Sequence, residues 1–91
     1  MSVDVRIPTL LRGYTGGAAS VAAAPGSVRQ LLDSLETAYP GIRARVLDET
    51  GSVRRFVNIY VGEDDVRFGD GLDTVATDGA TVSIIPAVAG G

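Results

Sequence analysis

Alternating apolar and polar residues near both ends of the chain predict two strands that each bury one face. The apolar positions in residues 3–7 are Val3, Val5 and Ile7, and residues 81–85 form the second segment. Side chains alternate between the two faces of a strand, so a period of two collects the apolar ones on one face. Because a helical crossover separates the segments, we expect them to pair in parallel at the centre of one sheet.

The segment from Ser27 to Tyr39 carries the pattern of an amphipathic helix. Ser27 and Gln30 fit a capping box, in which each side chain bonds the backbone N–H of the other residue. Pro40 and Gly41 end the pattern, because proline disfavours the helical region for the residue before it. Apolar residues at i, i+3, i+4 and i+7 form one stripe, which predicts packing of the helix on a sheet. The stripe consists of Val28, Leu31, Leu32 and Leu35.

The remaining strands have weaker signals. Residues 18–24 can pair back on the first strand after the turn at residues 15–17. Residues 54–61 are rich in β-branched and aromatic side chains, which is typical of a central strand, and we expect this strand to be the longest. A turn at residues 62–65 then leads to a short return strand at residues 66–68.

Short helical segments are expected at residues 43–47 and at residues 72–75, and Pro86 marks the exit from the last strand. The order strand, strand, helix, strand, short strand, strand predicts an α+β fold. In this fold, a mixed sheet of four to five strands packs on one main helix in two layers. A chain of 91 residues is long enough for one such domain.

Composition removes most side-chain chemistry. The chain has no cysteine and no histidine, which excludes disulfides, zinc sites built on these residues, thiolate nucleophiles and imidazole catalysis, and we assign no metal site. A net charge of −3 argues against nucleic acid as a partner, because binding to phosphates needs an excess of basic residues. We find no signal peptide and no membrane span, and therefore expect a cytoplasmic protein.

The end of the chain is the feature that can carry chemistry. Residues 87–91 end in two glycines and contain no side chain larger than valine. Five extended residues reach roughly 17 Å, so the terminal carboxylate of Gly91 could enter a narrow channel of another protein. We expect a domain of residues 1–86 followed by this flexible tail; the simpler alternative is a frayed terminus. The residues expected to be recognised with Gly91 are Pro86, Ala87, Val88, Ala89 and Gly90.

Five segments carry a resemblance over almost the whole chain: residues 7–12, 15–17, 55–61, 65–68 and 85–91. In these segments the sequence resembles the ThiS/MoaD family of ubiquitin-like sulfur carriers, and within it the CysO type. The final heptapeptide Ile-Pro-Ala-Val-Ala-Gly-Gly is the most specific of the five. The resemblance implies a ubiquitin-like β-grasp fold.

The resemblance also implies a mechanism centred on Gly91. An E1-like enzyme would use ATP and magnesium to adenylate the carboxylate, and sulfur would then displace AMP to give a thiocarboxylate. In CysO-type pathways the thiocarboxylate donates sulfur to a pyridoxal-phosphate-dependent synthase in cysteine biosynthesis, and a metalloprotease releases the product. The protein itself would be a cosubstrate, not an enzyme, and would bind no cofactor of its own.

Other functions stay open. The same chemistry could supply sulfur for thiamin, molybdopterin or thiosugar biosynthesis. A ubiquitin-like modifier would join Gly91 to lysines of target proteins, and a plain interaction module would have an inert tail. Sequence patterns do not separate these alternatives.

Further residues are candidates for a partner surface. The acidic turn at residues 63–65 is typical of a solvated loop, and we assign it no role. Arg67, with the pair at residues 54–55, could contact an acidic partner, although arginine beside an exposed strand is commonly ordinary surface charge. Three aromatic residues could form an exposed apolar patch, or could pack in the core. They are Phe56, Tyr60 and Phe68.

Overall fold

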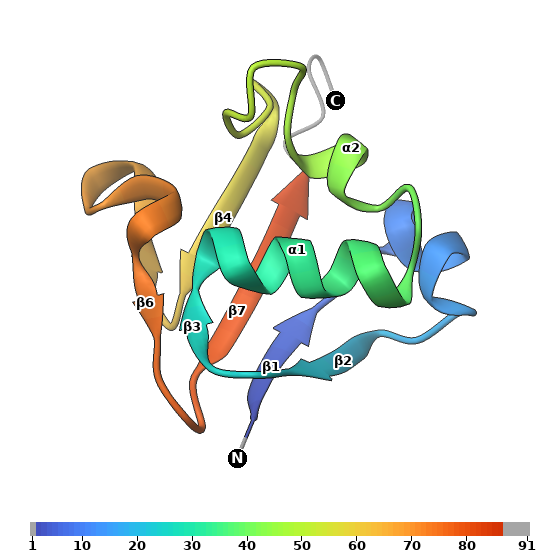
Figure 1. Ribbon diagram of the computed structural model, residues 1–91, viewed down its shortest axis with the longest axis horizontal. Helices are drawn as coiled ribbons and strands as arrows, with labels where there is room; N and C mark the ends of the chain where they lie inside the picture. The colour runs from blue at the N-terminus through green and yellow to red at the C-terminus, as the bar shows by residue number, and fades with distance from the viewer. Residues whose placement is uncertain (1, 87–91) are drawn as a thin grey trace.

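The two alternating segments at the ends of the chain lie side by side and run parallel, which confirms the predicted pairing. Val5 pairs with Val82, and Asp4 pairs with Thr81. The computed structural model, which describes residues 2–86, contains a mixed five-stranded sheet with the main helix across one face (Figure 1). In spatial order the strands are β2 (Ser20–Ala23), β1 (Val3–Arg6), β7 (Thr81–Pro86), β4 (Val57–Val61) and β5 (Asp64–Asp65).

The main helix, α1 (Val28–Ala38), begins and ends where the sequence predicts. The Ser27 hydroxyl accepts a hydrogen bond from the Gln30 N–H at 3.2 Å, and the Gln30 side-chain oxygen accepts one from the Ser27 N–H at 2.9 Å. This reciprocal pair satisfies two backbone donors that a helix start leaves free. All four residues of the apolar stripe are buried against the sheet.

Shorter elements complete the fold. The first is a 3₁₀ helix that the sequence analysis did not predict, in the β1–β2 connection, where it ends at Gly16 with a φ of 67°. A positive φ of this size favours glycine, which has no Cβ. β3 and β6 form a separate antiparallel pair beside the start of α1. These elements are η1 (Thr9–Thr15), β3 (Gly26–Ser27), α2 (Arg43–Val46), η3 (Gly71–Asp73) and β6 (Val75–Ala76).

Three strand and turn predictions are wrong in detail. The strand expected at residues 54–61 begins only at Val57, because the Val57 N–H closes a turn on the Arg54 carbonyl at 3.0 Å. With five residues, β4 is also shorter than the six-residue β7. The return strand is β5, and residues 66–68 instead form a 3₁₀ turn, η2 (Val66–Phe68), because the Asp65 carboxylate accepts from the Arg67 N–H and caps this turn.

The hydrophobic core lies between α1 and the covered face of the sheet. The strands contribute their alternate residues, and the segment around α2 closes one end. Ile42 and Val46 are fully buried there, which anchors the crossover between α1 and β4. The buried strand residues are Val3, Val5, Val57, Ile59, Val82 and Ile84.

Candidate functional site

The last described residue, Pro86, ends β7 and pairs with Val57 at the start of β4. The chain therefore continues toward Gly91 from the end of the strand that lies between β1 and β4 at the centre of the sheet. Gly91 and the predicted recognition residues 87–90 lie outside the described residues. The structure thus positions the point at which the predicted tail begins.

A hollow of about 380 Å³ adjoins that point. Its lining is largely apolar, and Leu10 on its rim is 70% exposed. The Arg45 Nε donates to the Tyr14 hydroxyl at 2.7 Å, which raises the pKa of Arg45. Arginine is protonated at ordinary pH, so its guanidinium places a cation at the edge of the hollow. The lining residues are Leu10, Leu11, Tyr14, Arg45, Val57, Ile84 and Pro86.

The sequence analysis missed this hollow, because η1 and α2 contribute to it from distant parts of the chain. One signal was present: the adjacent pair Leu10 and Leu11 fits neither a strand nor an amphipathic helix. An apolar pair without a periodic pattern favours a role in packing or contact.

The predicted aromatic surface divides into two places. Phe56 is 50% exposed, and the Arg55 guanidinium lies 5.7 Å from the centre of its ring. Phe68 is 92% exposed and lines a second hollow together with the half-buried Tyr60. Core packing is therefore wrong for Phe56 and Phe68. Phe56 lines a separate hollow together with Arg55, and that hollow shares no lining residue with the one at Phe68.

Arg67 contacts its own chain. Its guanidinium donates to the carbonyl of Val57 at 2.6 Å and to the carbonyls of Arg54 and Arg55, both at 3.3 Å. These three acceptors lie in the turn that precedes β4 and on the first residue of that strand. Arg67 thus supports the turn next to Pro86, and its charge faces backbone carbonyls.

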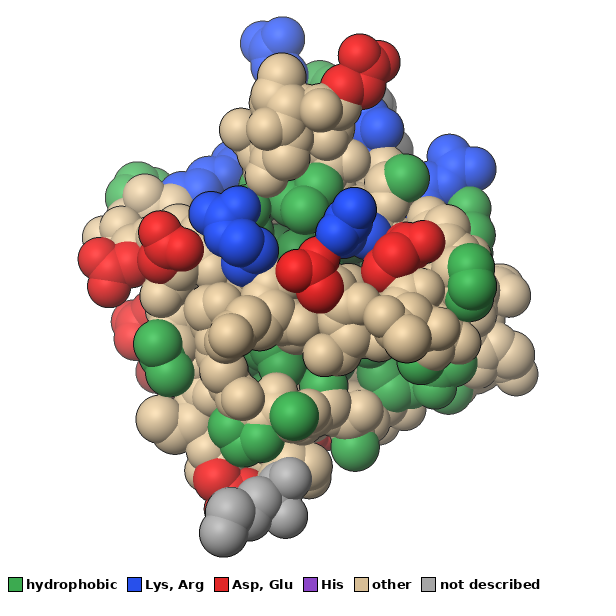
Figure 2. All heavy atoms as spheres, in the orientation of Figure 1, with side chains coloured by type: hydrophobic (Ala, Val, Ile, Leu, Met, Phe, Trp, Pro, Cys, Tyr) green, Lys and Arg blue, Asp and Glu red, His purple; other side chains and the backbone are tan. Residues whose placement is uncertain are grey.

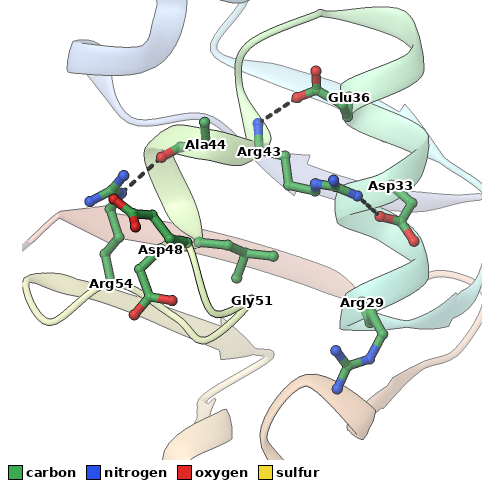
Figure 3. Close-up of a pocket in the computed structure, with 10 residues that line it drawn as sticks. Arg29, Asp33, Glu36, Arg43, Ala44, Asp48, Gly51 and Arg54 are labelled. Carbon is green, nitrogen blue, oxygen red and sulfur yellow. Dashed lines mark hydrogen bonds and ion pairs between the residues drawn. The ribbon is translucent and has the colours of Figure 1, made fainter.

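A charged groove of about 500 Å³ runs between α1 and residues 43–54 (Figure 3). Figure 2 shows acidic and basic side chains next to one another across this face, around an apolar floor. The groove is a candidate binding site by its size and charge. Its lining residues include Arg29, Asp33, Glu36, Arg43, Leu47, Asp48 and Arg54.

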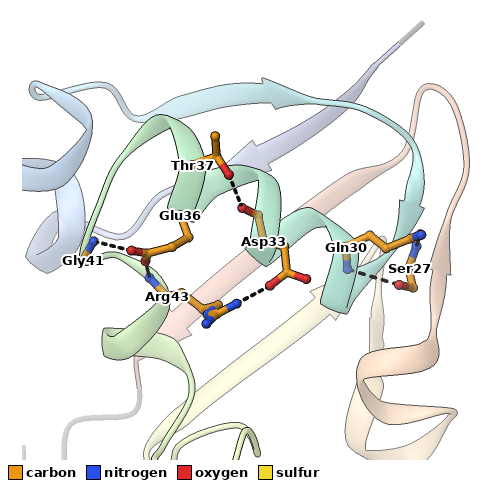
Figure 4. Close-up of polar contacts among 7 residues, drawn as sticks. All are labelled: Ser27, Gln30, Asp33, Glu36, Thr37, Gly41 and Arg43. Atoms are coloured by element: carbon orange, nitrogen blue, oxygen red, sulfur yellow. Dashed lines mark hydrogen bonds and ion pairs between the residues drawn. The ribbon is translucent and has the colours of Figure 1, made fainter.

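The contacts of these side chains indicate a structural role. The Glu36 carboxylate accepts from the N–H groups of Gly41 at 2.9 Å and Arg43 at 3.0 Å, which lowers the pKa of Glu36 (Figure 4). Arg43 forms an ion pair with Asp33. The Arg54 Nε donates to the Ala44 carbonyl at 2.8 Å. The network therefore fastens the crossover to α1, and few of its charges remain for a ligand.

The Asp48 carboxylate, at the end of the groove, is also hydrogen-bonded within its own chain. It accepts from the Thr50 hydroxyl at 2.6 Å and from the Ser52 N–H at 3.1 Å, and these bonds lower the pKa of Asp48.

Within residues 2–86, no three acidic side chains are arranged to hold a metal ion. None of the helices in that same range is long and apolar enough to cross a bilayer.

The arrangement of sheet and helix defines the class of protein. A five-stranded mixed sheet with parallel β1 and β7 at its centre, crossed by α1, is a ubiquitin-like β-grasp domain. Residues 5–91 match the model of the ThiS family. The chain belongs to the ThiS family.

Individual relatives match all or most of the chain. It is 50% identical over 93 residues to the sulfur carrier protein CysO of Mycobacterium tuberculosis, with all of both chains covered. It also matches a chain in the crystal structure of the BexX/CysO complex of Amycolatopsis orientalis with a TM-score of 0.91 and 47% identity, covering 98% of this chain and 99% of that one. Small archaeal modifier protein 3 of Haloferax volcanii is 38% identical over 65 residues, which is 71% of this chain and 70% of the relative.

Proposed function

We propose that this protein is a sulfur carrier of the CysO type whose reactive group is the C-terminal carboxylate of Gly91. The observation that carries the proposal is the Gly-Gly terminus, which follows the central strand of a β-grasp domain after three small or medium-sized apolar residues. Full-length identity of 50% to a named sulfur carrier supports it.

The proposed chemistry needs nothing from the side chains of this protein. In the active site of an E1-like enzyme, the Gly91 carboxylate attacks the α-phosphate of ATP. This step releases pyrophosphate and forms an acyl-AMP. A sulfide equivalent then adds to the acyl carbon and expels AMP, so that a thiocarboxylate replaces the carboxylate. The absence of histidine and cysteine from the chain is compatible with this division of labour, in which the protein is a cosubstrate.

The domain and the tail have separate tasks in this proposal. Residues 1–86 present a surface for recognition, and residues 87–91 carry the carboxylate into the active site of the partner. Small side chains in the tail allow the walls of a channel to approach its backbone closely. The apolar hollow around Leu10 and Tyr14 includes Pro86 in its lining, so an enzyme that receives the tail can contact this hollow as well.

The acceptor of the sulfur is proposed from the CysO likeness. It is a pyridoxal-phosphate-dependent synthase of cysteine biosynthesis, followed by a metalloprotease that releases the product, in the cytoplasm. A second candidate, conjugation of Gly91 to proteins, rests on the similarity to a small archaeal modifier protein. The chain has no lysine, so lysine-linked chains of this protein cannot form.

Intact mass spectrometry tests the proposal. The protein is incubated with the E1-like enzyme of its own cell, ATP, magnesium and sulfide. The mass should rise by the difference between one sulfur and one oxygen atom, and the shift should map to the last peptide. If the mass is unchanged with every activating enzyme of that cell, the sulfur-carrier proposal is wrong, and higher-mass conjugates in cell extracts would favour the modifier.

A further inference from the structure

The hollow beside β5 and η2 combines an exposed aromatic ring with a recess. It has a volume of about 560 Å³, and both Tyr60 and Phe68 line it. Phe68 is 92% exposed, although the neighbouring Val66 is buried in the core. Thr74 lines the same hollow, and its buried hydroxyl has no hydrogen-bond partner among residues 2–86. A fully exposed phenylalanine beside a recess marks a contact surface more strongly than a phenylalanine on a flat one.

Four acidic residues line this hollow together with the two rings. They are Glu63, Asp64, Asp65 and Asp70.

None of these four forms an ion pair within residues 2–86, where the ion pairs join Arg29 to Asp73 and Arg43 to Asp33. Arg67, although it lies in η2, directs its guanidinium to backbone carbonyls of the turn before β4. Asp65 accepts from the Arg67 N–H, but the charges of Glu63, Asp64 and Asp70 are not compensated by the described part of the chain. Carboxylates beside an aromatic recess complement a basic side chain that is flanked by apolar groups.

The hollow lies close enough to the start of the tail for one partner protein to contact both. Tyr60 pairs with Ser83 on β7, three residues before Pro86. Three residues of a strand span about 10 Å, so a protein that receives the tail can cover this hollow at the same time.

We propose that the hollow formed by Tyr60, Phe68 and the surrounding carboxylates docks a basic and apolar surface of the E1-like enzyme, with Phe68 entering an apolar pocket. This inference rests on the proposed function, because it takes its partner from it. It assigns a role to the acidic turn that the sequence analysis left without one. It also separates Phe68 from Phe56, which lies outside this hollow.

Equilibrium binding tests the docking surface independently of sulfur transfer. The full-length protein is titrated into its E1-like enzyme by calorimetry without ATP, at low and at high salt. Phe68→Ala should weaken binding about tenfold, as loss of a central aromatic contact does. Asp64→Asn combined with Asp70→Asn should weaken binding severalfold at low salt and should reduce its dependence on salt.

A matched double variant controls for net charge. Asp4→Asn combined with Glu49→Gln removes two exposed negative charges outside the hollow, neither of which forms an ion pair within residues 2–86, and should bind like the parent at both salt concentrations. Asp65 is left unchanged in all variants because it caps η2. Melting temperatures equal to that of the parent would show that each variant is folded.

The outcomes separate the two proposals. If Phe68→Ala and the Asp64/Asp70 variant both bind as tightly as the parent, or if the control variant loses as much affinity as the Asp64/Asp70 variant, the docking surface is wrong. The sulfur-carrier proposal stands in that case as long as the parent gains sulfur. If the parent binds its activating enzyme through this hollow but gains no sulfur, the docking surface stands and the sulfur-carrier proposal fails.

Discussion

The groove beside α1 and the hollow beside β5 both carry several carboxylates, but only the groove also has arginines, and the contacts of the carboxylates differ. In the groove, Glu36 bonds two backbone N–H groups, and Asp33 pairs with Arg43. In the hollow, carboxylates such as Asp64 have no ion-pair partner within the described part of the chain, and Phe68 is almost fully exposed. A charge that the chain itself satisfies contributes to the fold, whereas an unsatisfied one next to an exposed ring remains available to a partner.

The two regions therefore have different roles, one in stability and the other in contact with a partner. The side of α1 holds the core together, and the side of β4, β5 and the end of β7 leads to the tail. Variants should therefore affect either stability or sulfur transfer, but not both.

The largest effect is expected at the end of the chain. One residue added after Gly91 moves the carboxylate away from the position that an adenylating site must hold, and Gly90→Val adds a side chain where close backbone approach is expected. Both variants should gain no sulfur in the intact-mass assay, while their melting temperatures equal that of the parent. Thiocarboxylation of the extended variant at the parental rate, without trimming back to Gly91, would refute the assigned role of the carboxylate.

The next largest effect is expected under α1. Leu32→Ala or Leu35→Ala should lower the free energy of unfolding by about 2–5 kcal/mol, because each side chain is buried and its loss leaves a cavity. Urea unfolding measures this change. Phe68→Ala is the matched control on the other side of the molecule, where unfolding should change by less than about 0.5 kcal/mol. Equal losses for the two substitutions would contradict the division into two sides.

A smaller, pH-dependent effect is expected in the groove. Hydrogen bonds from Gly41 and Arg43 lower the pKa of Glu36 in the folded protein. A lowered pKa means that the ionised side chain stabilises the fold above the pKa of the unfolded state, about 4.3 for glutamate, and that this contribution is lost as the pH falls through the folded value.

The stability difference between the parent and Glu36→Gln should therefore shrink as the solution is acidified below that pH. Urea midpoints for both proteins at neutral and acidic pH measure it. Asp48 titrates in the same direction in both proteins, so its contribution cancels in the difference. A difference that stays constant with pH would show that the Glu36 carboxylate does not stabilise the crossover.

The smallest effect on stability is expected from the tail. Removal of Gly90 and Gly91 takes away no apolar side chain, so the melting temperature should remain nearly unchanged while sulfur transfer is lost. Differential scanning calorimetry of the full and shortened chains makes the comparison. A clear drop in melting temperature would mean that the terminal glycines contribute to the fold, which would weaken the carrier proposal.

The sequence by itself determined the elements whose signals are local. The capping box at Ser27, the stripe that ends at Leu35 and the alternation in residues 3–7 each depend on neighbours within a few positions, and the structure confirms all three. The two-layer α+β arrangement was also predictable from the order of the elements, and the family resemblance implied that it is a β-grasp fold. The terminal glycines are readable from the sequence alone.

Only the tertiary structure decided which charged and aromatic residues are available. Arg67 donates to carbonyls that lie 10 to 13 residues away, and Arg45 donates to Tyr14 across 31 positions, so no local pattern could reveal that these side chains are engaged. The exposure of Phe68 depends likewise on the 3₁₀ turn that the Asp65 cap produces in place of a strand. Local periodicity specifies an element and its buried face, but the availability of a side chain depends on contacts that form only when distant segments pack together.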